Sequence, residues 1–167
     1  MVLGGEDGTV YVVSVSDWHI LKEIKVTSSS IHALRFSRWD ERLAVGCSDG
    51  VLMLLSPKDD WKIIGEIDTS ESSISCIDWS SRHLAVGRTD GSVDIFEAAR
   101  VYDNFFLPEA ELTRGDGPVN TVSFGASGQF LGAFSSASQH INLSYILFCS
   151  SILCSYWRRK RKARRLQ

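Results

Sequence analysis

The side chains that could carry chemistry in this chain are its histidines, cysteines and acidic pairs. Histidine and cysteine bind metals or act as acid, base or nucleophile when their spacing brings several of them together. No CxxC pair occurs, and Cys149 and Cys154 have no histidine partners at zinc-ligand spacing. The four histidines share no spacing either, and they are His19, His32, His83 and His140. We therefore expect packed or surface histidines and structural thiols.

Other catalytic motifs are also missing from the sequence. The acidic pairs Asp40-Glu41 and Asp59-Asp60 fall in predicted turns, where acidic side chains favour the local geometry. No GxSxG nucleophile elbow and no phosphate-binding glycine loop occurs. We therefore expect a protein that is not an enzyme and that has no cofactor, metal site or small-molecule substrate.

Charge divides the chain into an acidic body and a basic tail. The 167 residues include 18 basic and 20 acidic side chains, a formal net charge of −2. All acidic residues lie at or before Asp116, and seven basic residues fall within 158–165, so residues 1–157 carry 11 − 20 = −9. A body this acidic repels nucleic acid, so contact with a polyanion is expected only through the tail. The chain begins without a recognisable secretory signal, which favours a cytoplasmic or nuclear protein.

The elements that would position any site repeat along the chain. Asp-Gly pairs recur with spacings of 42 and 41 residues, at Asp7-Gly8, Asp49-Gly50 and Asp90-Gly91. A second motif, apolar-x-x-apolar-x-aromatic, recurs with spacings of 43 and 45 residues, beginning at Ile31, Ile74 and Val119. Two motifs that keep one period in one phase indicate structural repeats of this length.

Each full period contains four strand-like segments separated by turn residues. The predicted strands of one unit are 31–37, 42–48, 51–57 and 61–67, and those of the next are 74–80, 83–89, 92–98 and roughly 105–113. Residues 51–55 are apolar at both parities, as in strands covered on both faces of a sheet. An Asp-Gly pair favours a type I′ hairpin, whose two central residues both need positive φ. Four-stranded sheets stacked at a fixed period predict an all-β propeller.

These segments resemble WD40 repeats. The family order of inner strand, second strand, Asp-containing turn, third strand and outer strand is matched by IHALRFS, RLAVGCSDG, VLMLL and WKIIGEI, and again by ISCIDWS, HLAVGRTDG and SVDIF. A weaker likeness links the chain to echinoderm microtubule-associated-protein-like propellers and to WD40-like domains of anaphase-promoting-complex type. The resemblance implies a partial propeller of about three to four four-stranded blades with an irregular C-terminal tail. The units would span 1–28, 29–71, 72–116 and, incompletely, 117–135.

The chain departs from the family pattern at two places. The Trp-Asp pair that ends the third strand is absent, and so is the Gly-His pair before each inner strand. In the family, that histidine and the turn aspartate belong to a buried network with Ser/Thr and Trp. Asp7, Asp49 and Asp90 match the turn aspartate, but the sequence shows no partner for them.

The repeat pattern fades after Ser135. Ala137-Ser138 stands where the next Asp-Gly would fall, so an arc of a larger ring, from a fragment or truncated gene model, is the expectation. Residues 136–157 are apolar, and residues 158–167 form a basic tail. Three interpretations stay open for these two segments. They are sequence unrelated to a blade, a basic tail that acts as a nuclear localisation signal or contacts a polyanion, and a membrane anchor at 141–157.

The resemblance implies a non-enzymatic scaffold that binds proteins or peptides through its loops. The turns at Asp7-Gly8, Asp49-Gly50 and Asp90-Gly91 are the expected structural corners. The candidate partner surface around them consists of Glu6, Ser48, Glu71, Arg88, Thr89 and Asp116. Two alternatives remain: a cytoskeletal or microtubule-associated propeller piece, and a propeller tethered to a membrane by residues 141–157.

Overall fold

The computed structural model describes residues 1–38, 41–68, 72–102, 108–113, 117–135 and 142–146. Within them the chain forms four antiparallel sheets, each built from strands that are consecutive in sequence. The first sheet has the order β1 (Val2–Gly4), β2 (Thr9–Val13) and β3 (Ile20–Lys25). The second has the order β4 (Ile31–Phe36), β5 (Leu43–Cys47), β6 (Val51–Ser56) and β7 (Lys62–Asp68).

Two further sheets repeat this arrangement. The third consists of β8 (Ile74–Trp79), β9 (His83–Arg88), β10 (Ser92–Glu97) and β11 (Ala110–Thr113). The fourth consists of β12 (Val119–Phe124), β13 (Leu131–Ser135) and β14 (Asn142–Ile146). A 3-10 turn at Pro57–Asp59 and the short helix α1 (Ala98–Tyr102) are the helical segments described.

The predicted strands agree with the observed ones to within a residue or two, with two differences. The predicted strand 105–113 is confirmed only from Ala110, because α1 follows β10 directly; residues 103–107 lie outside the described part. Strand β14 falls in segment 136–157, for which no strand was predicted, and it pairs with β13. The rest of that segment, the tail and the proposed unit ends at 69–71 and 114–116 also lie outside the described residues.

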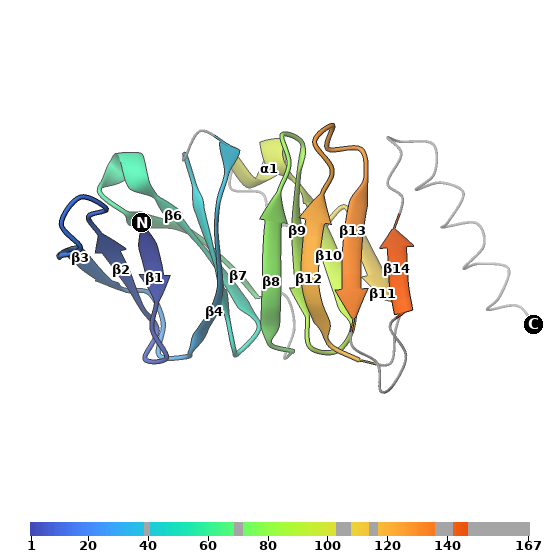
Figure 1. The fold of residues 1–167 in the computed structure, drawn as a ribbon, viewed down its shortest axis with the longest axis horizontal. Coiled ribbons are helices and arrows are strands. Elements are labelled where there is room, and N and C mark those ends of the chain that lie inside the picture. Colours follow the sequence, from blue (N-terminus) through green and yellow to red (C-terminus); the bar gives the residue numbers. More distant parts are fainter. Residues whose placement is uncertain (39–40, 69–71, 103–107, 114–116, 136–141, 147–167) are drawn as a thin grey trace, which may run out of the picture.

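The sheets stand in a row, and each packs against the next (Figure 1). Strands β4, β8 and β12 are equivalent by repeat, and β8 contacts both of the others. Each of the three has a register irregularity after its first residue, between Ile31 and Ala33, Ile74 and Cys76, and Val119 and Thr121. A bulge increases local twist, so the repeated bulge gives each inner strand the same shape. The partial propeller architecture is thereby confirmed.

The core lies between the sheets. All five residues of β5 are buried. In β6, β9 and β10, every residue is buried except one at a strand end. This burial confirms that these strands are covered on both faces. Apolar clusters join adjacent sheets: one contains Val10, Val45 and Leu55, and another contains Leu54, Val86 and Phe96. Each sheet is thus stabilised by its neighbours, as in stacked repeats.

One glycine in each of the equivalent strands β1, β5 and β9 makes this stacking possible. Gly4, Gly46 and Gly87 lie opposite the first residue of the next inner strand, Ile31, Ile74 and Val119. A Cβ at Gly4 would lie 2.9 Å from the Cβ of Ile31, and one at Gly46 would lie 3.0 Å from that of Ile74. Such distances are shorter than van der Waals contact, so a larger residue would push neighbouring sheets apart.

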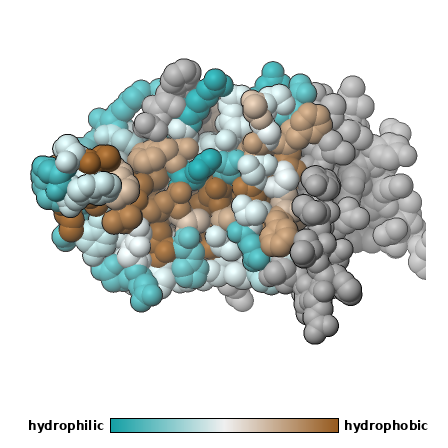
Figure 2. Space-filling view, in the orientation of Figure 1, coloured by the Kyte–Doolittle hydropathy of each residue, from teal (hydrophilic) through white to brown (hydrophobic). Residues whose placement is uncertain are grey.

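Apolar side chains also reach the surface. In Figure 2 they form a band across the left and middle of the view, bordered by hydrophilic residues. Within the described part of the chain, no helix is both long and apolar enough to cross a membrane.

Candidate functional site: the turn face

The three Asp-Gly corners have one common geometry. They lie in the short loops 5–8 between β1 and β2, 48–50 between β5 and β6, and 89–91 between β9 and β10. The glycine N–H donates to the carbonyl three residues earlier, at 3.2 Å for Gly8 to Gly5, 3.2 Å for Gly50 to Cys47 and 3.3 Å for Gly91 to Arg88. We call the end of the sheets that carries these loops, together with links 26–30, 72–73 and 117–118, the turn face.

The predicted type I′ turn is wrong. Positive φ occurs at the glycines, with 81° at Gly8, 85° at Gly50 and 87° at Gly91, but at none of the three aspartates. The loops therefore resemble a three-residue hairpin in which a type I turn precedes a left-handed glycine. Close packing reinforces the requirement for glycine, since a Cβ at Gly8 would lie 2.7 Å from the carbonyl oxygen of Ser29.

Each aspartate instead stabilises its turn through its carboxylate. Asp7 Oδ1 accepts the backbone N–H of Thr9 at 3.1 Å, Asp49 Oδ1 that of Val51 at 3.2 Å, and Asp90 Oδ1 that of Ser92 at 2.9 Å. Aspartate commonly bonds the backbone two residues further on in this way.

Hydrogen bonds also hold two of these carboxyl groups in the charged form. The Thr9 hydroxyl donates to Asp7 Oδ2 at 2.7 Å and lowers the pKa of Asp7, assisted by Lys25. Burial alone would raise the pKa of Asp90, but hydrogen bonds from Ser92 outweigh it, and the pKa is lowered. The carboxylate form is therefore the one that these turns stabilise.

A second layer of bonds connects the links to the turns. The N–H of Ser48 donates to the Ser30 carbonyl at 2.9 Å, and that of Thr89 donates to the Ser73 carbonyl at 3.0 Å. In the first sheet, Gly5 accepts the N–H of Ile31 at 3.1 Å. Backbone atoms on both sides of each contact restrain the loops of the turn face.

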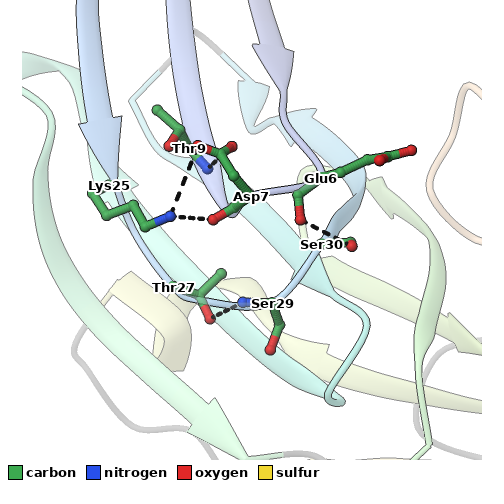
Figure 3. A network of polar contacts seen from close by, with 7 residues as sticks. All are labelled: Glu6, Asp7, Thr9, Lys25, Thr27, Ser29 and Ser30. Atoms are coloured by element: carbon green, nitrogen blue, oxygen red, sulfur yellow. Dashed lines mark hydrogen bonds and ion pairs between the residues drawn. The ribbon is translucent and has the colours of Figure 1, made fainter.

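Figure 3 shows the first corner of this face in detail. Lys25 Nζ donates to the carbonyl of Asp7 and lies 3.8 Å from Asp7 Oδ2. Ser30 Oγ donates to the Glu6 carbonyl at 3.0 Å, so the link and the turn approach each other through side chains as well. The Glu6 carboxylate points away from this network.

Serines of the links bond to the aspartates of the next two corners. Ser29 Oγ donates to Asp49 Oδ2 at 2.6 Å. Ser72 Oγ accepts the N–H of Asp90 at 3.1 Å and lies 3.1 Å from the hydroxyl oxygen of Thr89. The sequence showed no partner for these aspartates because a serine in a serine-rich link has no distinctive signal. Its position two residues before the inner strand is the signal that could have identified it.

The candidate partner residues occupy different environments. Glu6 and Thr89 are exposed on the turn face, and Ser48 is half-buried there. Glu71 and Asp116 lie outside the described residues. Placing Arg88 on the surface was wrong: its side chain is 5% exposed and is paired with Asp94 on the adjacent strand. Because Arg88 lies opposite Ser92, Asp94 is its diagonal neighbour on one sheet face, and this cross-hairpin charge pair was readable in the sequence.

The described cysteines are thiols in packed positions. Burial raises the pKa of Cys47 to about 11, with a smaller effect from Asp49. Burial also raises the pKa of Cys76. Thiols with raised pKa values are poor nucleophiles. In the part of the chain that the structure describes, no group of three His, Cys, Asp or Glu side chains is placed to hold a metal ion.

Comparison with known families agrees with this architecture. Residues 1–82 match the family model of the anaphase-promoting complex subunit 4 WD40 domain. The matched residues cover the first sheet, the second sheet and strand β8. WD40 repeat domains are generally non-catalytic scaffolds that bind other proteins. Residues 1–82 therefore belong to the WD40-repeat family, and the sheets that follow repeat the same strand order.

Proposed function

We propose that this protein is a non-enzymatic scaffold that binds other proteins through its turn face, within a larger complex in the cytoplasm or nucleus. The observation that carries the proposal is the bonding of the links to the turns. Ser48 and Thr89 donate from their backbones to the links, while the side chains of Glu6 and Thr89 are exposed. A loop surface restrained before binding loses little conformational entropy when a partner docks.

Two further features support the proposal. Functional residues gather on loops that a rigid scaffold positions, and here buried sheets support each loop. Cys47 and Cys76 are free thiols, as is usual in reducing compartments.

A site-specific cross-linking experiment tests which end of the sheets binds partners. A photoreactive amino acid is placed at Glu6 or Thr89 on the turn face, and at Lys58 or Lys62 at the opposite end, in the full chain. We expect a discrete cross-linked protein from the turn-face positions. Cross-links to a discrete protein only from Lys58 and Lys62, or no discrete product from any position, would contradict the proposal.

Once the cross-linked partner is identified and purified, its affinity for the full chain can be measured. The double variant Glu6→Lys/Thr89→Lys should weaken binding at least tenfold in titration calorimetry, because it reverses one charge and adds another at the interface. The matched variant Lys58→Glu/Lys62→Glu should bind as the unmodified chain does. Equal losses in both variants would assign the effect to overall charge and reject the turn face.

A further inference from the structure

A cavity of about 530 Å³ lies at the end of the sheets opposite the turn face. It is formed where β4, β8 and β12 end and where the loops that follow them begin. Figure 1 shows the arrows of these three strands pointing toward the same end. Its lining includes Arg35, Arg38, Asp78, Trp79, Ser81 and Ser123. This volume lies in the range of sites that bind small molecules or single side chains.

One repeat position supplies the polar centre of the cavity. Arg35, Asp78 and Ser123 precede the aromatic residue in the motifs IHALRFS, ISCIDWS and VNTVSFG. Because the inner strands lie next to one another, these three residues line the same cavity although they are 43 and 45 residues apart in the sequence. The equivalent position therefore carries a different side chain in each repeat, and the three repeats together supply the polar residues of the cavity.

Asp78 connects three sheet edges at this point. Its side chain is 7% exposed, and Oδ1 accepts Arg35 Nε at 2.9 Å. Oδ2 accepts the backbone N–H of Phe124 at 2.7 Å. Both carboxylate oxygens are therefore engaged by neighbouring sheets, which satisfies the buried charge.

This arrangement leaves part of the Arg35 guanidinium available. Arginine and carboxylate often pair through two parallel bonds, but Arg35 uses Nε toward Asp78. Among the residues that the structure describes, its two terminal nitrogens donate no hydrogen bond to the protein. The Arg35 side chain is 58% exposed. The buried carboxylate of Asp78 therefore holds Arg35 at Nε, and the two terminal nitrogens of the guanidinium face solvent.

The chemistry around Arg35 selects an anionic ligand. The terminal nitrogens of Arg35 face solvent at the cavity, and both carboxylate oxygens of Asp78 beside it are already engaged, although residues 1–157 as a whole are acidic. The exposed Ser81 and Ser123 add hydroxyl groups, and the aromatic rings of Trp79 and Phe124 add apolar surface beside the arginine. The terminal nitrogens of a guanidinium match the two oxygens of a carboxylate.

We propose that this cavity binds the side-chain carboxylate of an acidic peptide segment of a partner protein, with Arg35 as the recognition residue and Asp78 as its positioning residue. The proposal goes beyond the turn face, because it concerns the opposite end of the sheets and a defined partner chemistry. Either surface can fail its own test without affecting the other.

Blocked, fluorescein-labelled peptide pools test the proposal by anisotropy with the full chain. Each pool has mixed neutral residues around one fixed position, which is glutamate, glutamine, lysine or phosphoserine. We expect the glutamate pool to bind at least tenfold more tightly than the glutamine pool, and the lysine pool not to bind. Equal binding of glutamate and glutamine pools, or no glutamate binding at millimolar concentration, would overturn the proposal. A phosphoserine pool that binds more than tenfold tighter than glutamate would replace the carboxylate with a phosphate and overturn it as well.

Variants separate recognition from a purely structural ion pair. Arg35→Gln should weaken glutamate binding at least tenfold, and Arg35→Lys should weaken it less, since the charge remains but the fork is lost. Arg82→Gln removes an equal charge from an exposed residue outside the lining and should bind normally. Circular dichroism and thermal unfolding establish that each variant is folded. A folded Arg35→Gln protein with unchanged glutamate binding would show that the Arg35–Asp78 pair is structural only.

Discussion

Single residues on the turn face combine backbone geometry with charge. The glycine of each corner adopts positive φ, and the aspartate beside it accepts the N–H two residues later. The sequence identified the position and residue types of these corners. It did not identify the turn type, because Asp-Gly fits both a two-residue loop and a three-residue loop. The strand register, which depends on packing across the whole sheet, decides between them.

The Asp90 carboxylate should make stability depend on pH. Folding lowers the pKa of this group below its ordinary value of 3.8, so its stabilisation is complete above that value and is lost as pH falls through the lower folded-state pKa. Asp90 is exposed, so solvent screening keeps this effect small. Asp90→Asn should therefore reduce the free energy of unfolding by about 0.5 kcal/mol at pH 7 and by less near pH 3. Urea unfolding at the two pH values measures this difference.

Asp68→Asn provides the control, because it removes an exposed carboxylate outside the turns. It should leave the unfolding free energy nearly unchanged at both pH values. An Asp90→Asn loss that stays constant from pH 7 to pH 3 would show that the charge of Asp90 plays no part in holding the turn.

At the scale of elements, the sheets depend on small residues at their contacts. Gly4, Gly46 and Gly87 keep the repeat period and each lies against the first residue of the next inner strand. The short apolar runs bounded by turn residues predicted the strands themselves. The sequence did not show which glycine served a turn and which served packing, because both roles use the same residue and only the distance to the next sheet separates them.

Gly46→Ala should destabilise the contact between the second and third sheets. The added Cβ would lie 3.0 Å from both Ile74 Cβ and Ile77 Cδ1, and these side chains belong to the core. Overpacking of this kind costs about 1–3 kcal/mol of unfolding free energy. Thermal and urea unfolding of the purified full chain measure the loss.

Gly132→Ala is the matched strand control. The nearest atom to its added Cβ is the Ser123 carbonyl oxygen at 3.8 Å, which is ordinary contact. Its effect should stay within about 0.5 kcal/mol, as for substitutions away from tight packing. Similar losses in both variants would mean that strand propensity, rather than the approach of the sheets, explains the glycines.

At the scale of the whole molecule, stability is distributed unevenly along the row of sheets. Strands β5, β6, β9 and β10 are buried on both faces, whereas four residues of β3 are exposed. The first sheet also carries exposed apolar side chains, among them Leu3, Ile20 and Leu21. A row of repeats gains stability from neighbour contacts, so its inner members are expected to open least often.

Hydrogen exchange should reflect this gradient. The amides of β5 and β9 should exchange at least about tenfold more slowly than the paired amides of β3, because their exposure requires separation of two packed faces. Mass spectrometry of peptides from the native full chain gives the rates. Equal protection of β3 and β9 would indicate one cooperative unit in which burial does not set local stability.

The sequence by itself determined the repeat period, the strands from β4 to β10 and the positions of the corners, because these depend on local apolar runs and on turn residues. Only the tertiary structure decided that the Arg88–Asp94 pair is buried and that Asp78 connects Arg35 with Phe124. Strand β14 also required it, since its pairing with β13 left no clear pattern in the sequence. In each case the deciding interaction joins separate strands, and the free energy of such contacts depends on register and sheet stacking rather than on neighbouring residues.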